Sequence, residues 1–152
     1  MNQKKLKTSS LPLALVSGLL EDSGRYFFII RKLQNGKEKT ETLDLLSVKL
    51  EKGNEPTLFL KEEFRDLFNM EVSVDQIIYE AKTNAGSKKH KSFVPLLVFK
   101  VEARNRTARI SESAIAKGVV GYKWLSLLDA KKQKLSKNCT WILNWKKSES
   151  PL

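Results

Sequence analysis

A run of carboxylates between residues 57 and 68 is the feature of this sequence with the clearest potential for chemistry. Glu62, Glu63 and Asp66 fall within TLFLKEEFRDLF, a segment whose pattern favours a helix. Side chains three positions apart share one face of a helix, so Glu63 and Asp66 could hold one cation together. Mg²⁺ takes hard oxygen ligands of this kind in proteins. The spacing therefore indicates a candidate site for one divalent ion.

The same segment has an ordinary structural interpretation. Leu60, Phe64, Leu67 and Phe68 follow the spacing of an apolar stripe that packs against a core. The charged residues would then form a solvated face with short-range charge pairs. Both interpretations place a helix here, and the second one requires no ligand.

The residues around this helix have a recognisable layout. From residue 46 to residue 74 the order is an extended segment, a Lys52-Gly53-Asn54 turn, the helix, and alternating apolar positions. This layout resembles the box of the Nudix hydrolases, G-x5-E-x7-R-E-U-x-E-E-x-G-U, in which U is a bulky apolar residue. Laid on residues 48–70, the box is matched at Glu63, Phe64 and Met70, with the shorter carboxylate Asp66 at its next glutamate.

Several positions of the box depart from the family pattern. Asn54 replaces the early glutamate, and Leu67 replaces the second glutamate of the later pair. The two glycines fall on Val48 and Asn69, and the arginine falls on Glu62. A leucine cannot ligate Mg²⁺, and it removes negative charge from the site. We therefore interpret the segment as a Nudix box with an eroded active site.

The resemblance implies a hydrolase of nucleoside diphosphate-linked substrates that depends on Mg²⁺ or Mn²⁺. Glu63 and Asp66 are then the expected catalytic residues and metal ligands. Many members carry a further glutamate in the loop before a late strand, for which Glu112 is the best candidate and Glu102 the second. Because the box is incomplete, an inactive module that binds nucleotide or RNA is an alternative, as is a protein-interaction domain.

The wider pattern extends the resemblance over nearly the whole chain. Strand-like segments flank the box helix, and Ser136 is suited to N-cap a last helix. The family fold is an α/β/α sandwich around a mixed, partly antiparallel sheet, of the α+β or α/β class. Tyr122 and Trp124 lie in a segment similar to the family's late strand. They could line a base-stacking pocket, and core packing is the alternative.

The length of 152 residues and the hydrophobic content of 41% predict one folded domain. We expect a flexible basic arm at residues 1–10, the domain at 11–147 and a tail at 148–152. A single cysteine, Cys139, excludes an internal disulfide and fits a reducing compartment. No apolar run is long enough to span a bilayer. A cytoplasmic protein with no membrane partner is the resulting expectation.

Charge is the second informative property. The net charge is +11, and lysines dominate its clusters, among them Lys88 and Lys89. Such clusters attract polyanions, so Lys88 and Lys89 are candidate substrate-binding residues and RNA is a candidate partner. Solubilising surface lysines are the plain alternative. The family resemblance also allows a homodimer.

Overall fold

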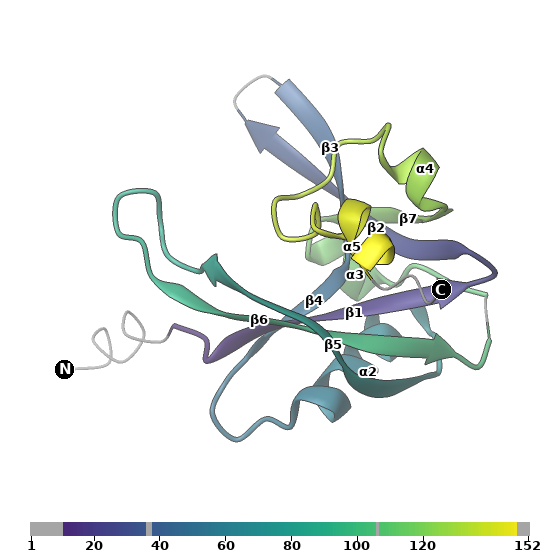
Figure 1. Ribbon diagram of the computed structural model, residues 1–152, viewed down its shortest axis with the longest axis horizontal. Helices are drawn as coiled ribbons and strands as arrows, with labels where there is room; N and C mark the ends of the chain where they lie inside the picture. The colour runs from purple at the N-terminus through teal and green to yellow at the C-terminus, as the bar shows by residue number, and fades with distance from the viewer. Residues whose placement is uncertain (1–10, 36–37, 106, 149–152) are drawn as a thin grey trace.

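The computed structural model describes residues 11–35, 38–105 and 107–148 (Figure 1). The arm expected at residues 1–10 and residues 149–152 of the expected tail lie outside these ranges. The strands are β1 (Ala14–Asp22), β2 (Arg25–Asn35), β3 (Glu38–Asp44), β4 (Leu46–Leu50), β5 (Val72–Asn84), β6 (Phe93–Ala103) and β7 (Val119–Leu125). The helices are α2 (Pro56–Phe68), α3 (Glu112–Ala116), α4 (Leu127–Ala130) and α5 (Ile142–Ser148).

The strands form one mixed sheet, and β1 holds its two halves together. The first part of β1 pairs antiparallel with β4 and parallel with β6, and β6 also pairs with β5. The end of β1 turns into β2, which pairs antiparallel with both β3 and β7. Positive φ angles of 55° at Ser23 and 80° at Gly24 form the tight turn of this hairpin. The predicted mixed, partly antiparallel sheet is confirmed.

Helix α2 begins and ends at residues that satisfy its free backbone groups. The Glu55 carboxylate accepts hydrogen bonds from the backbone N–H groups of Thr57 and Leu58, at 3.2 and 2.9 Å, and Pro56 follows it. At the other end Asn69 adopts the left-handed conformation, with φ of 55°. Asparagine tolerates this conformation better than most residues with a side chain. The box pattern that this segment resembles has glycine at this position, and Asn69 forms the same kind of left-handed turn.

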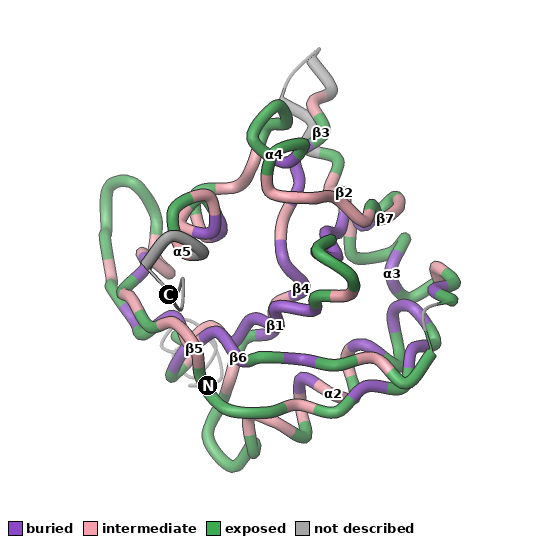
Figure 2. The backbone as a smooth tube through the Cα atoms, turned by 45° about the vertical axis from the view of Figure 1, so that its right-hand side comes forward, coloured by how far each residue is buried: buried purple, intermediate pink, exposed green. Residues whose placement is uncertain are grey.

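The apolar stripe of α2 packs onto one face of the sheet. Leu60, Phe64, Leu67 and Phe68 are all buried, and Figure 2 shows burial concentrated along β1 and the strands beside it. Phe27 of β2 lies among them, with ring centroids 6.2 Å from Phe64 and 5.2 Å from Phe68. The predicted packing of the apolar stripe against the core is therefore confirmed.

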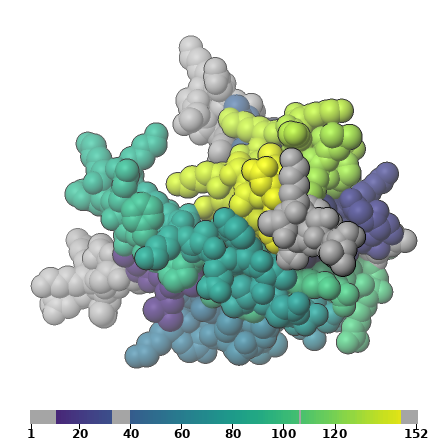
Figure 3. Space-filling view, in the orientation of Figure 1, coloured from purple at the N-terminus to yellow at the C-terminus, as the bar shows by residue number. Residues whose placement is uncertain are grey.

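The other face of the sheet is covered by the C-terminal segment. Successive residues of β2 alternate between the two faces, so Phe28 packs with Ala130 of α4 and Ile142 of α5. Trp141 stacks on Tyr79 of β5, with ring centroids 4.1 Å apart and planes 8° apart. Figure 3 shows the C-terminal segment lying against β5. Helices on both faces make the predicted α/β/α sandwich.

The last helix begins later than the sequence indicates. Helix α5 starts at Ile142, so Ser136 does not cap it. Ser136 instead donates its backbone N–H to the Leu43 carbonyl at 2.9 Å, which ties the segment to β3. A tertiary contact has replaced the expected local cap. Within the described residues, no helix has the length and apolar character that crossing a bilayer requires.

Gly18 of β1 sets how closely α2 approaches the sheet. A Cβ atom at this position would lie 2.9 Å from a ring carbon of Phe64 and 3.0 Å from a methyl group of Val101. Separations this short require the neighbours to move, because protein interiors are close-packed. The small residue is therefore a packing requirement of the helix that carries Glu63.

We expect Gly18→Ala to lower the free energy of unfolding by about 1–3 kcal/mol, because the methyl group overpacks the contact with α2. Urea unfolding followed by tryptophan fluorescence measures this loss. Gly121→Ala is the matched control, since its Cβ would lie an acceptable 3.4 Å from Ile30. Equal losses for the two variants would contradict this account of Gly18.

Candidate functional site

Glu63 lies beside the buried stripe of α2, and its carboxylate is paired with a lysine. Glu63 Oε2 lies 3.1 Å from Lys117 Nζ. The Glu63 side chain is 13% exposed, whereas the Lys117 side chain is 52% exposed. The ammonium group therefore approaches a largely shielded carboxylate from the solvent side, and water screens this pair less than a fully exposed one.

Helix α3, which the sequence analysis did not predict, brings Lys117 to α2. Its N-cap residue Ser111 donates its hydroxyl to the Asp66 carbonyl at 2.7 Å and its backbone N–H to the Leu67 carbonyl at 2.9 Å. Lys117 is the C-cap residue, and Gly118 follows with φ of 85°. The main chain that carries Lys117 is thus fixed against α2 at the start of α3.

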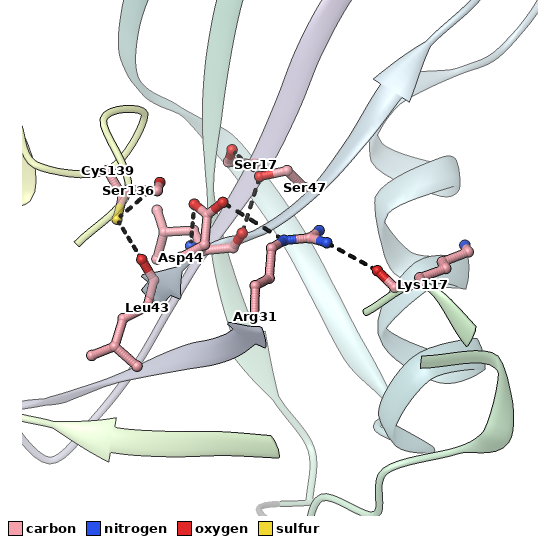
Figure 4. Close-up of polar contacts among 9 residues, drawn as sticks. Ser17, Arg31, Leu43, Asp44, Ser47, Lys117, Ser136 and Cys139 are labelled. Carbon is pink, nitrogen blue, oxygen red and sulfur yellow. Dashed lines mark hydrogen bonds and ion pairs between the residues drawn. The ribbon is translucent and has the colours of Figure 1, made fainter. Parts of the chain in front are cut away.

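A second basic side chain reaches the same place from the sheet. Arg31 of β2 donates from Nη1 to the Lys117 carbonyl at 3.3 Å, and its Nε lies 3.9 Å from Asp44 Oδ2. Figure 4 shows Arg31 between Asp44 and the Lys117 backbone, with the Lys117 side chain directed toward the helix. Glu63 pairs with the Lys117 ammonium group, and Arg31 links Asp44 to the Lys117 main-chain carbonyl; we call these four residues the charged row.

The inner end of the charged row is buried and polar. Burial raises the pKa of the Asp44 carboxyl group, and the Ser136 hydroxyl and the Arg31 guanidinium partly offset this by favouring the charged form. Next to it, the Ser17 and Ser47 hydroxyls lie 2.7 Å apart (Figure 4). Hydrogen-bonding groups therefore continue from the surface at Lys117 into the space between the strands.

The residues around α2 do not fit the metal centre that the family resemblance implies. The described part of the chain holds no group of three or more His, Cys, Asp or Glu side chains that could bind a metal ion together. Leu67, at the position of the missing glutamate, is 2% exposed and belongs to the core. Glu63 already carries a positive partner in Lys117. A multi-carboxylate centre is therefore not assembled here.

The other expected ligands lie apart from Glu63. Asp66 is exposed, and its carbonyl, not its carboxylate, makes the bond to α3. Glu112 is exposed in the first turn of α3, whereas Lys117, which pairs with Glu63, lies at the C-terminal end of that helix. Glu102 lines a cavity of about 460 Å³ that is lined by no residue of α2. The loop before β7 thus supplies an ammonium group in place of the expected carboxylate.

The two aromatic candidates pack mainly into the core. Tyr122 stacks on Phe27 with centroids 5.5 Å apart, and its hydroxyl donates to the Ala108 carbonyl at 3.1 Å. Trp124 meets Phe27 edge-on at 5.1 Å and also lines a surface hollow beside Arg25. The packing alternative accounts for both rings, and a contact with a nucleobase stays a prediction.

Lys88 and Lys89 are exposed in the loop between β5 and β6. Helix α2 leads into the start of β5, whereas this loop follows the end of β5, roughly 40 Å along the strand at its usual rise per residue. Figure 1 shows the loop projecting from the edge of the molecule. These lysines are not brought to the charged row, and their role in binding substrate stays a prediction.

Sequence reasoning missed Lys117, Arg31 and Asp44. A local signal existed for the first, because Ser111 followed by Glu112 suits a helix start and Lys117-Gly118 suits a helix end. No local signal pairs Arg31 with Asp44 or Lys117 with Glu63. Each of these contacts joins residues that only the sheet and the docking of α3 bring together.

We expect the Glu63–Lys117 pair to show a coupling energy of about 0.5–1 kcal/mol in a double-mutant cycle, because Glu63 is shielded from solvent. The cycle uses Glu63→Gln and Lys117→Met, which keep side-chain length, and measures stability in urea. The Arg65–Glu71 pair, with N···O 3.2 Å and both side chains more than half exposed, is the control. A coupling energy no larger than that of the Arg65–Glu71 pair would contradict the claim that the Glu63–Lys117 pair is shielded from solvent.

Cys139 is expected to be unreactive in the folded protein. Burial raises its pKa to about 12, and the nearby Asp44 charge adds to this effect. The thiolate is the nucleophile, so almost none is present at pH 8 in the native state. A thiol-specific chromogenic reagent should label Cys139 only after denaturation. Fast native labelling at pH 8 would show that the thiol is neither buried nor held neutral.

The sequence by itself leads to no relative: no protein-family model matches it, and no curated protein matches it. Comparison of the structure with solved structures gives a different result. The fold described above recurs in many of them.

Three solved structures illustrate the likeness. A MutT Nudix hydrolase from Burkholderia pseudomallei matches with a TM-score of 0.67 at 14% identity, covering 90% of this chain and 98% of that one. The Nudix domain of Shewanella oneidensis NrtR, complexed with ADP ribose, matches at 0.61 with 10% identity, covering 99% and 100%. An ADP-ribose pyrophosphatase from Streptococcus suis matches at 0.62 with 10% identity, covering 93% and 96%. Since the matches span nearly the whole of each chain, this protein has the Nudix hydrolase fold.

Proposed function

We propose that this protein is a Nudix-fold module that binds a nucleoside diphosphate-linked ligand without cleaving it. The proposal depends on two side chains of α2 at positions where the family binds its metal ion. At the box positions that should hold a cation, Leu67 is buried in the core and Glu63 is paired with Lys117. Catalysis by this family requires a metal ion to polarise the phosphoryl group and to generate a nucleophile. Leu67 offers no ligand for such an ion, and Lys117 competes with it for Glu63, which supports binding without cleavage.

The case for ligand binding rests on the charged row. Arg31 offers a guanidinium group whose side chain is about one-third exposed, at 34%, and it donates to the main-chain carbonyl of Lys117, whose ammonium group lies at Glu63. Guanidinium groups bind phosphate through parallel, charge-assisted hydrogen bonds, and ammonium groups add a compact positive charge. Two of the similar structures concern ADP ribose, a nucleoside diphosphate linked to a sugar. We therefore choose ADP ribose as the ligand with which to test binding by this chain.

A second candidate is weak hydrolysis assisted by Mg²⁺ or Mn²⁺ at Glu63 and Asp66. It is favoured by the position of these two carboxylates, which lie three residues apart and outside the apolar stripe of α2. One or two carboxylates can suffice for Mg²⁺ when a bound substrate supplies phosphate oxygens. On this alternative, the pair of Glu63 with Lys117 would have to open before the ion could bind.

Calorimetric titration with ADP ribose, in EDTA and in Mg²⁺, separates the two candidates. We expect saturable binding in both buffers and no release of AMP over several hours by chromatography. Arg31→Ala should weaken binding about tenfold, which corresponds to about 1.4 kcal/mol. Lys32→Ala is the control, since its side chain points to the opposite side of β2, and it should change affinity by less than about twofold.

The outcomes are distinct. Mg²⁺-dependent release of AMP that is lost in Glu63→Gln would establish the second candidate and contradict the first. Binding that Arg31→Ala and Lys32→Ala weaken equally would show that general charge, and not the charged row, attracts the ligand. Melting temperatures of both variants must be compared, because Arg31 also pairs with Asp44.

A further inference from the structure

The fold fixes the main chain from which the Lys117 side chain reaches Glu63. The Lys117 backbone N–H donates to the Ser113 and Ala114 carbonyls at 3.2 and 3.0 Å, and its own carbonyl accepts from Arg31. The start of α3 is bonded to the last turn of α2 through Ser111. Anchors on both sides therefore hold the root of this side chain next to Glu63.

The charges around Glu63 balance without a metal ion. Glu63 is the more shielded partner of the pair, and withdrawing a carboxylate from water without a counter-charge is unfavourable. A single ammonium group 3.1 Å away supplies that counter-charge. Leu67 adds no negative charge, so a divalent ion at this place would leave excess positive charge. It would also be repelled by Lys117 at short range.

We propose that Lys117 is a built-in cation that takes the place of a divalent metal ion on α2. Its ammonium group neutralises Glu63 and keeps Mg²⁺ and Mn²⁺ away from the helix. This inference concerns the cation at the proposed ligand site and holds whether or not a nucleotide binds there. With Lys117 in this role, the positive charge of the site belongs to the protein and does not depend on binding a metal ion.

The replacement has a chemical consequence for the site. A bound metal ion can lower the pKa of a water ligand far enough to make hydroxide near neutral pH. An ammonium group has no open coordination position and cannot do so. It can still attract phosphate as a point charge. A site with Lys117 in this role would hold a diphosphate group without activating the water that cleaves it, in agreement with the proposed function.

The test measures divalent-ion binding in the absence of any nucleotide, so its outcome is independent of the ligand proposal. Lys117→Glu replaces the ammonium group with a carboxylate opposite Glu63. The melting temperature is then followed during titration with MnCl₂. We expect Lys117→Glu to gain a saturable rise of about 3 °C or more at ten times its dissociation constant. Wild type and EDTA-treated protein should melt at the same temperature, with no saturable response to Mn²⁺.

Two controls make the result specific. Lys131→Glu introduces the same charge change at another exposed lysine that caps a short helix, and it should give no saturable response. Glu63→Gln combined with Lys117→Glu should abolish the gain. If Lys117→Glu does not fold without metal, Lys117→Gln is measured by electron paramagnetic resonance of Mn²⁺, where affinity should rise at least threefold over wild type.

Several results would overturn the proposal. One is a saturable Mn²⁺ response in wild type that Glu63→Gln removes, because the metal would then bind despite Lys117. Another is a Lys117→Glu response no larger than that of Lys131→Glu. For the charge-neutral variant, an Mn²⁺ affinity equal to that of wild type would show that the ammonium group does not exclude the ion.

Discussion

The seating of α2 on β1 is the constraint on which the rest of this structure depends. The stripe from Leu60 to Phe68 is buried against the sheet, and Gly18 permits the close approach of Phe64. Once the stripe is fixed, the rotation of the helix is fixed as well. Glu63 must then lie at the edge of the contact, where α3 can reach it. Packing therefore decides which side chains of the box are available for chemistry.

Leu67 shows how packing and chemistry compete at one position. In the Nudix box this position carries a glutamate, whereas here it adds apolar surface to the core, at 2% exposure. Apolar burial of this kind contributes about 1.5–3 kcal/mol per large side chain. The negative charge of that glutamate is absent here, and the Lys117 ammonium group pairs with Glu63. The fold is kept, and we propose that the cation beside α2 is the Lys117 ammonium group instead of a metal ion.

Much of the scaffold could be predicted from sequence because its signals are local. The stripe of α2, its start near Pro56, and the left-handed residue Asn69 all follow from short-range spacing and propensity. The site could not be predicted in the same way. Lys117 and Glu63 are 54 positions apart, and the order of strands and the docking of α3 bring them together. Ser136 does not cap α5 for a related reason, since its backbone bond to Leu43 is tertiary.

The central claim is that an ammonium group occupies the place of the metal ion on α2. Anomalous diffraction from a crystal of the wild-type protein soaked in MnCl₂ tests it most directly. The account predicts no manganese peak within ligand distance of the Glu63 carboxylate, with Lys117 Nζ still bound there. A manganese ion coordinated by Glu63 and Asp66, with the Lys117 side chain displaced into solvent, would contradict it.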